Sequence, residues 1–86
     1  MSRYRIELRP AATRAIAKLD PQIRLRIQGA IVLLGEDPRP PASRRLKGRP
    51  EYRVRIGDYR IIYAIENDAL LVIVITLGHR RDIYDR

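Results

Sequence analysis

The sequence contains no cysteine and only one histidine, His79, among its 86 residues. Without thiols the chain can form neither disulfides nor thiolate metal sites, and a reducing compartment is favoured. A single histidine with scattered carboxylates does not make a zinc site. We therefore expect no bound metal and no cofactor.

Long hydrophobic runs are also missing. No apolar segment reaches the roughly 20 residues that are needed to cross a bilayer. The charged residues Arg3, Arg5 and Glu7 occupy the region where a signal peptide carries its apolar segment. These absences predict a cytoplasmic protein with no membrane segment.

Positive charge is what the sequence has in excess. Eighteen Lys and Arg residues against ten Asp and Glu residues give a net charge of +8, and only Lys18 and Lys47 among the basic residues are lysines. The planar guanidinium group of arginine suits two-point contacts with phosphate. A polyanionic partner is therefore favoured. The alternatives are that the charge only keeps the protein soluble, or that it reflects arginine-rich codon usage. A serine hydrolase is excluded in practice, because the only serines are Ser2 and Ser43.

The first half of the chain predicts a strand followed by two helices. Alternation in residues 4–9 indicates a short, half-buried strand, and Pro10 fits the first turn of a helix. Asp20-Pro21 predicts the start of a second helix that ends near Gly35 and directs Arg24 and Arg26 outward. The expected buried face of this second helix consists of Ile23, Ile27, Ala30, Ile31 and Leu34.

The second half predicts a loop followed by three strands. Residues 37–50 contain four prolines and a glycine, which indicates a basic loop without regular structure. Two strands then flank Gly57-Asp58, and the strand at 69–77 is apolar on both faces, so we place it inside the sheet beside the N-terminal strand. The order β-α-α-β-β-β predicts one α+β domain over residues 1–86. Its sheet would be four-stranded and rich in antiparallel pairs, with a helical hairpin on one face.

Arginines gather on one patch of this predicted sheet. Arg53 and Arg55 alternate with apolar residues and therefore share a face. If Gly57-Asp58 is a two-residue turn, Arg55 lies directly across from Arg60, although like charges at such positions are destabilising. A phosphate bound among the arginines would relieve the repulsion. The alternative is a solvated edge strand whose charge blocks unwanted pairing. Pairing of the 69–77 strand would bring His79 and the residues after it to the same rim.

Two segments together resemble a known family. "RLKGRPEYRVRIGDYRIIYAI" followed by "VIVITLGHRRDIY" resembles the RelE/ParE superfamily of bacterial toxins, and the similarity covers nearly the whole chain. The resemblance implies a microbial-ribonuclease-like fold, a type II toxin–antitoxin system and a cognate antitoxin that wraps the toxin. In RelE-type members it implies a ribosome-dependent endoribonuclease that cleaves mRNA and inhibits translation. The alternative is a ParE-type toxin, a non-enzymatic inhibitor of DNA gyrase with the same fold.

The resemblance also implies roles for individual residues. We expect catalytic roles for Arg60, Arg80, Tyr84 and His79, and RNA binding by Arg53, Arg55, Arg45, Lys47 and Arg81. RelE-type members often carry lysine at the positions of Arg53 and Arg55, and one of these lysines is proposed as the general base. Arginine is a poor proton acceptor. His79, which titrates nearer to neutral pH, could take over that role.

Overall fold

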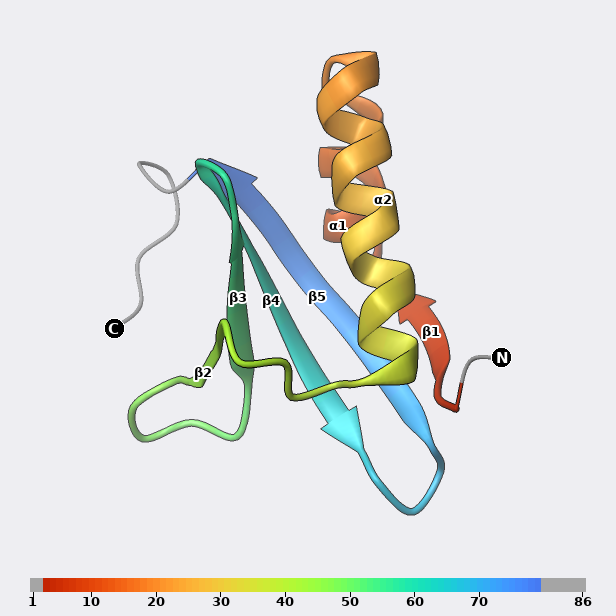
Figure 1. The fold of residues 1–86 in the computed structure, drawn as a ribbon, viewed down its shortest axis with the longest axis vertical. Coiled ribbons are helices and arrows are strands. Elements are labelled where there is room, and N and C mark those ends of the chain that lie inside the picture. Colours follow the sequence, from red (N-terminus) through yellow and green to blue (C-terminus); the bar gives the residue numbers. More distant parts are fainter. Residues whose placement is uncertain (1–2, 80–86) are drawn as a thin grey trace.

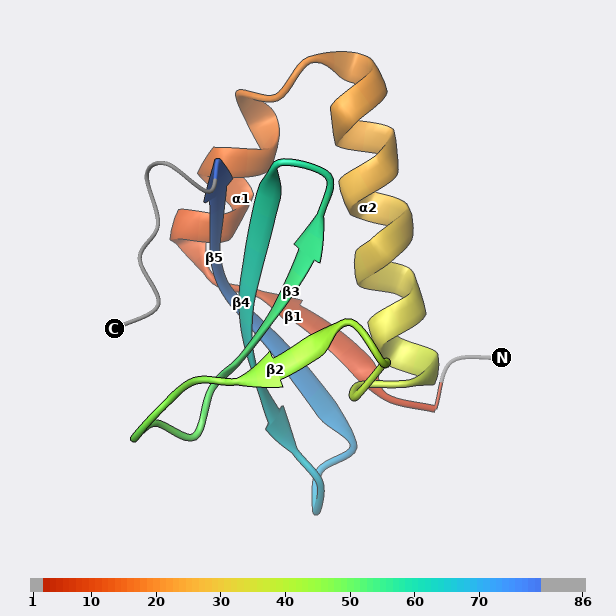
Figure 2. The same ribbon diagram turned by 60° about the vertical axis from the view of Figure 1, so that its left-hand side comes forward.

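The computed structural model describes residues 3–79, which form two helices and one five-stranded sheet (Figure 1). The elements in chain order are β1 (Arg5–Leu8), α1 (Pro10–Ala17), α2 (Pro21–Glu36), β2 (Ser43–Arg45), β3 (Tyr52–Ile56), β4 (Tyr59–Glu66) and β5 (Leu71–His79). The strand order is β1-β5-β4-β3-β2, in which only the β1–β5 pair is parallel. Both helices pack on the same face of the sheet (Figures 1 and 2). The α+β class and the place of β5 beside β1 are as predicted.

The helices begin at the two prolines that the sequence marks. Pro10 and Pro21 occupy first-turn positions, where the missing amide proton costs nothing and the fixed φ suits a helix. Asp20 is the N-cap residue of α2, but its carboxylate makes no capping hydrogen bond. The carbonyl of Gly35 in the last turn accepts hydrogen bonds from the amides of Arg3 and Tyr4 at 3.1 and 2.8 Å. These bonds fasten the start of the chain to the end of α2.

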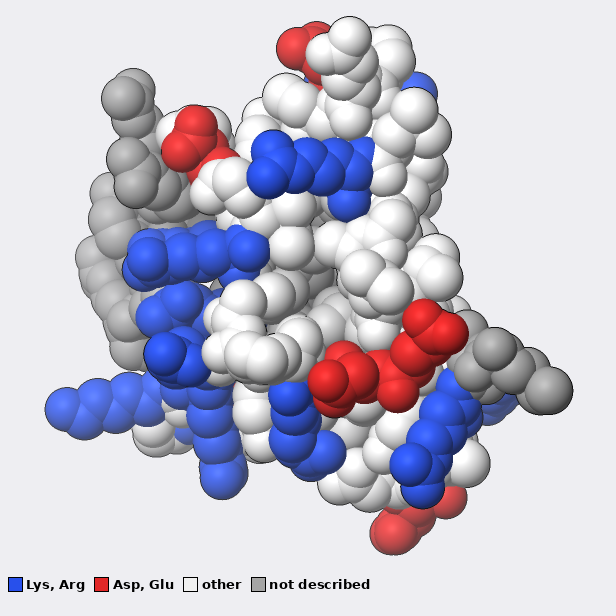
Figure 3. All heavy atoms as spheres, in the orientation of Figure 1, with Lys and Arg blue, Asp and Glu red and all other residues white. Residues whose placement is uncertain are grey.

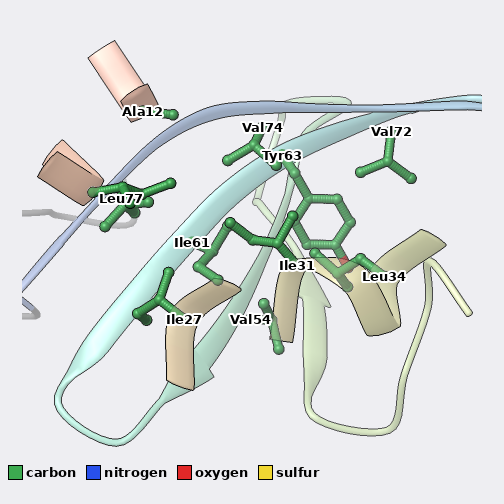
Figure 4. Packing of buried hydrophobic residues seen from close by; sticks show 11 residues of the cluster. Ala12, Ile27, Ile31, Leu34, Val54, Ile61, Tyr63, Val72, Val74 and Leu77 are labelled. Carbon is green, nitrogen blue, oxygen red and sulfur yellow. The ribbon is translucent and has the colours of Figure 1, made fainter. Parts of the chain in front are cut away.

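The hydrophobic core lies between α2 and the central strands (Figure 4). Ile27, Ile31 and Leu34 of α2 are buried, as predicted, against residues of β3, β4 and β5. Tyr63 of β4 is fully buried, and its hydroxyl donates a 2.6 Å hydrogen bond to the carbonyl of Pro38. Burial raises the pKa of Tyr63 to about 12, because the phenolate would lose its hydration. The core therefore also anchors the start of the loop that follows α2.

Part of the segment predicted to be irregular is a strand. Residues 43–45 form β2, which pairs with β3 at the edge of the sheet. Pro40 and Pro41 precede this strand, so their missing amide protons remove no hydrogen bond from its pairing with β3. The prediction of an irregular loop over 37–50 is wrong for these three residues, and the sheet has five strands instead of four.

The β3–β4 hairpin has the predicted register. Gly57 has a φ of 60°, which a glycine adopts without strain, and Ile56 pairs with Tyr59 across the turn. The guanidinium group of Arg26 lies close to this turn. A Cβ atom added at Gly57 would therefore come within 3.1 Å of Arg26 Nη1. The next strand starts later than predicted, at Leu71, because Leu70 closes the preceding turn with a φ of 50°.

The pairing of β4 with β5 contains a β-bulge. Ile62 pairs with Thr76 but Tyr63 pairs with Val74, so one residue of β5, Ile75, is inserted. Because side chains alternate across a strand, the inserted residue changes which face every later residue of β5 occupies. Leu77 therefore reaches the core, where it is 4% exposed.

Arg24 does not point outward, contrary to the prediction. Its Nε donates to the carbonyl of Ile16 at 3.3 Å, and its Nη2 donates to the carbonyls of Ala17 and Leu19 at 3.2 and 2.9 Å. These carbonyls lie at or just after the end of α1, where helical partners run out, and the carbonyl of Ile16 also accepts from the amide of Leu19 at 3.1 Å. Arg24 therefore caps α1 from the neighbouring helix.

Candidate nucleic-acid interface

The face of the sheet opposite the helices carries the clustered arginines. Arg53 and Arg55 alternate along β3 with Val54, which is 4% exposed in the core, so their side chains point away from the helices. Arg55 pairs directly with Arg60 of β4, as predicted. On its other side Arg60 pairs with Gly78 of β5, which has no side chain to cover it. Arg55 and Arg60 are thus direct cross-strand neighbours on this face.

A fourth arginine joins them through β2. Arg44 pairs with Arg53, so it lies on the same face, whereas Arg45 pairs with Tyr52 and lies on the opposite one. We call the set of Arg44, Arg53, Arg55 and Arg60 the arginine face. Sequence reasoning missed Arg44 because it treated residues 37–50 as irregular. Without a strand there, the sequence cannot assign either Arg44 or Arg45 to a face.

Positive charge continues into the loop between β2 and β3. Lys47 and Arg45 are exposed, and with Arg49 they surround a hollow of about 460 Å³ in this loop. The buried side chain of Leu46 holds the loop in place, and its amide donates to the carbonyl of Glu51 at 2.9 Å. The space-filling view shows lysine and arginine side chains gathered on the side where β2 and β3 lie (Figure 3). Arg45 and Lys47 thus extend the positive surface around the edge of the sheet.

The electrostatics of the arginine face suit a phosphate ligand. Cross-strand neighbours such as Arg55 and Arg60 have their Cβ atoms about 5 Å apart, a distance at which like charges destabilise the sheet. A nucleic-acid phosphate between two guanidinium groups converts that repulsion into two charge-assisted hydrogen bonds. The arrangement can therefore bind a phosphate and stabilise negative charge that develops on it.

His79 is not brought onto the arginine face. It pairs with Tyr59, and the two rings meet edge to face with their centroids 5.5 Å apart. Tyr59 packs against the core, so His79 lies on the helix side of the sheet, at the same end as the hairpin turn. The bulge in β5 is the cause of this placement. The expectation that His79 lies near the hairpin holds, but the histidine and Arg60 occupy opposite faces.

The remaining predicted site residues, Arg80, Arg81 and Tyr84, lie outside the described residues, and their roles stay predictions. Within residues 3–79, no group of three or more His, Cys, Asp or Glu side chains could hold a metal ion. No helix in this part of the chain is long and apolar enough to cross a membrane.

Comparison with known proteins identifies the class. Residues 6–84 match the family described as the ParE toxin of the type II toxin–antitoxin system parDE. The chain therefore belongs to this family of toxins, within the RelE/ParE superfamily. It is 31% identical over 87 residues to Toxin RelG of Mycobacterium tuberculosis (strain ATCC 25618 / H37Rv), an alignment that covers 96% of this chain and 98% of RelG.

Solved structures with the same fold include toxin–antitoxin complexes. RelE in the complex with RelB from Pyrococcus horikoshii OT3 is 25% identical with a TM-score of 0.81, covering 91% of this chain and 96% of that one. The intact RelBE complex of Escherichia coli gives 26% identity and a TM-score of 0.78, covering 88% and 95%. The RelBE2 complex of M. tuberculosis, with 24% identity, a TM-score of 0.79 and coverage of 93% and 94%, supports the fold alone.

Proposed function

We propose that this toxin is a ribosome-dependent endoribonuclease that cleaves mRNA without a metal ion, inhibits translation in the cytoplasm, and is neutralised by a cognate antitoxin. The observation that carries the proposal is the arginine face, where Arg55 and Arg60 stand as direct cross-strand neighbours on the side of the sheet that the helices leave uncovered. Two like charges at paired positions do not stabilise the sheet. The same two charges would stabilise a bound phosphate through charge-assisted hydrogen bonds. The solved relatives include RelE toxins in complex with RelB antitoxins, which supports an antitoxin as the partner.

The proposed reaction is an attack by a ribose 2′-hydroxyl on the adjacent phosphate. The P–O5′ bond breaks, a 2′,3′-cyclic phosphate forms, and the 5′-oxygen leaves with a proton. Arg60, with Arg55 beside it, stabilises the charge that develops on the phosphoryl oxygens. Arg53 and Arg44 contact neighbouring backbone phosphates and set the register of the RNA. The RelE-like assignments of Arg80 and Tyr84 complete the proposed site.

The ribosome has a defined task in this scheme. Rigid strands hold the guanidinium groups, but the described site is an open face that does not enclose a nucleotide. An mRNA held on the ribosome presents its backbone in one orientation, which replaces the positioning that a closed pocket supplies. We therefore expect the isolated toxin to cleave free RNA slowly.

Who accepts the proton from the 2′-hydroxyl is a separate question. Arginine is a poor proton acceptor, so the arginine face supplies no ordinary base. His79 is the remaining candidate, but it lies on the other face of the sheet from Arg60 and could reach the RNA only around the end of the sheet. The base role of His79 remains a hypothesis that the geometry opposes.

Single-turnover cleavage of mRNA on programmed ribosomes tests the proposal. Arg60→Ala should reduce the cleavage rate by about 100- to 1,000-fold, the typical loss when one donor to a developing oxyanion is removed. Arg14→Ala is the matched control, because Arg14 is an exposed arginine on α1 and should leave the rate unchanged. Equal losses in both variants would contradict a specific arginine site.

The same assay decides the histidine hypothesis. From the opposite-face placement we expect His79→Ala to stay within about threefold of the wild-type rate, with the same pH profile. A loss of 100-fold or more, together with loss of the alkaline rise in rate, would establish His79 as the base.

The rival function is inhibition of DNA gyrase, which the ParE description of the matching family favours. Induction of the toxin in cells separates the two functions. Ribonuclease activity predicts cleaved mRNA and an immediate stop of translation, without gyrase-linked DNA breaks. DNA breaks with intact mRNA would overturn the proposal in favour of the rival.

A further inference from the structure

The outermost strand of the sheet carries arginines on both of its faces. β2 is the last strand in the sheet order, so one of its edges pairs with β3 and the other has no strand beside it in the described part of the chain (Figure 2). Arg44 pairs with Arg53 and belongs to the arginine face, whereas its neighbour Arg45 pairs with Tyr52 on the helix side. Positive charge therefore continues around this edge from one face of the sheet to the other.

Another arginine reaches the helix side of this edge from the loop after α2. The Cζ atom of Arg39 lies over the ring of Tyr52, 5.5 Å from its centroid, and Arg39 Nε donates a 3.2 Å hydrogen bond to the Tyr52 hydroxyl. Tyr52 in turn stacks on the buried ring of Tyr63, with the centroids 5.9 Å apart. Arg39 is exposed to solvent, yet its guanidinium group is held on a ring that the core supports. We call the set of Arg39, Arg45 and Tyr52 the edge site.

Both arginines of the edge site are oriented by neutral groups. Arg39 donates to a phenol, and Arg45 Nε donates to the carbonyl of Arg49 at 3.3 Å. Within residues 3–79 neither guanidinium group pairs with a carboxylate, whereas Arg49 pairs with Glu51 at 3.0 Å. A cation that is held in place without a counter-ion suits an anionic ligand, because binding then costs little side-chain ordering.

The guanidinium group of Arg39 also offers a flat surface. A planar cation that rests on a tyrosine is the kind of platform on which an unpaired nucleobase stacks. Arg45, the cross-strand neighbour of the same tyrosine, is placed to contact a backbone phosphate. Acidic side chains of a protein partner would satisfy the charges alone, whereas single-stranded RNA satisfies the charges and the flat surface.

We propose that the RNA strand bound on the arginine face continues around the open edge of β2, where a base stacks on Arg39 and a backbone phosphate contacts Arg45. The inference rests on the proposed ribonuclease function and adds the path of the substrate beyond the cleaved bond. Because Arg39 and Arg45 lie on the other face of the sheet from Arg60, they should strengthen RNA binding without changing the rate of the chemical step.

Fluorescence anisotropy with the whole toxin tests the edge site directly. The probe is a labelled single-stranded RNA of about 12 nucleotides, within the range of known site sizes, whose 2′-O-methyl groups prevent cleavage. Arg39→Ala should weaken binding by about 5- to 100-fold, the range for loss of one stacked base. The matched control is Arg14→Ala, which removes an exposed arginine from α1 and should bind like the wild type.

Two further variants separate stacking from charge. Arg39→Lys keeps the charge without the flat surface, so it should bind nearly as weakly as Arg39→Ala; wild-type affinity would overturn the stacking role. Arg45→Ala should reduce the slope of log affinity against log salt concentration by about 1, the value for one phosphate contact. An unchanged slope would contradict a phosphate on Arg45.

NMR spectra of the wild-type toxin supply an independent measurement that needs no variant. Addition of the same RNA should shift the Nε–Hε signals of Arg39 and Arg45. The corresponding signal of Arg24, whose Nε donates to the carbonyl of Ile16, should stay in place. Unmoved signals of Arg39 and Arg45 in the presence of bound RNA would overturn the inference.

Cleavage on programmed ribosomes separates the inference from the proposed function. With a long mRNA, Arg39→Ala should raise the toxin concentration that gives the half-maximal rate and leave the maximal single-turnover rate unchanged. Truncation of the mRNA just beyond the cleavage site, on the 5′ or the 3′ side in turn, should in one case make variant and wild type equal, because the strand no longer reaches β2. A difference that persists with both truncations would assign the contact to another RNA and overturn the proposed path.

Two outcomes of the ribosome assay decide which proposal fails. Wild-type behaviour of Arg39→Ala on the long mRNA would overturn the inference and leave the proposed function intact. Absence of mRNA cleavage by the wild-type toxin would overturn the proposed function and, with it, the path of the substrate.

Discussion

The two faces of the sheet use arginine in opposite ways. On the helix side, the guanidinium group of Arg24 makes three hydrogen bonds to carbonyls at the end of α1. On the other side, Arg55 and Arg60 face one another as like charges. The first arrangement supplies donors to backbone carbonyls near the end of α1, and the second places two like charges next to each other, which costs stability. The net charge of a small protein therefore does not tell which charges stabilise the fold and which are available to a ligand. That distinction requires each charge to be assigned to a face of the sheet.

This contrast implies a division of labour. The helix-covered face should hold nearly all the stability, and the arginine face should lower stability slightly in exchange for ligand binding. The free energy of unfolding of matched variants measures this division on one scale.

The largest effect should come from the core. Ile27 is 1% exposed and packs from α2 onto the sheet. Ile27→Ala removes buried methyl groups and leaves a cavity, so it should lower the free energy of unfolding by about 2 to 5 kcal/mol in urea denaturation. Leu25→Ala, at an exposed position on the same helix, should change it by less than about 0.5 kcal/mol. Similar losses at both positions would contradict a core centred on this face.

High pH should weaken the same face through Tyr63. The pKa of Tyr63 is about 12 in the folded protein, against about 10 for an unperturbed tyrosine. Between these values the unfolded chain loses its proton first, so ionisation favours unfolding. Stability should be fully present below pH 10 and fall as the pH rises toward 12, by at most about 2.7 kcal/mol. Tyr63→Phe should remove this alkaline loss.

The control for that variant is its behaviour at neutral pH. There Tyr63→Phe should cost about 1 to 2 kcal/mol, because the buried carbonyl of Pro38 loses its hydrogen-bond donor. An alkaline loss of the same size in Tyr63→Phe and wild type would assign that loss to other groups.

Removal of the α1 cap should have a smaller effect. Arg24→Ala should lower the free energy of unfolding by about 1 to 2 kcal/mol, because the carbonyls of Ala17 and Leu19 lose the donor that Arg24 supplies. Amide exchange in α1 should accelerate more than exchange in α2. The control Arg14→Ala removes the same charge from α1 itself and should leave the free energy of unfolding nearly unchanged. Equal losses of stability in the two variants would show that the charge matters and the capping does not.

The smallest effect should have the opposite sign. Arg55→Ala removes one of two facing like charges and should raise the free energy of unfolding by about 0.2 to 1 kcal/mol, and it should weaken the proposed cleavage of mRNA. Added salt should shrink the difference between variant and wild type, since it screens exposed charges. A variant that is clearly less stable than the wild type would end the proposed division between the two faces.

Local chemistry allowed the hairpin and the helices to be predicted from the sequence. Gly57-Asp58 determines a two-residue turn, and alternation around it places Arg55 opposite Arg60. The prolines at 10 and 21 mark the helix starts, and the apolar spacing of α2 predicts its buried side. Each of these features depends on residues close together in the chain.

The features that the sequence did not predict depend on distant partners. β2 is three residues long and exists because β3 lies beside it. Arg24 turns back because α1 ends within its reach, which a helical periodicity cannot reveal. His79 changes face because Ile75 is inserted opposite β4, and a bulge leaves no clear mark in a run of apolar residues.

The parallel pair of β1 with β5 also determines when the protein can finish folding. β1 is made first, yet the strand that it bonds to is the last one described, with Arg5 paired to Leu71. Pairing between such distant segments must pay the entropy of closing a long loop, so it is slow compared with formation of the helices or the β3–β4 hairpin. While the toxin is being translated, β1 has no strand beside it until the residues of β5 have left the ribosome. The five-stranded sheet is therefore complete only after the residues of β5 have been synthesised, so the strands that carry the arginine face are made before the sheet that supports them is finished.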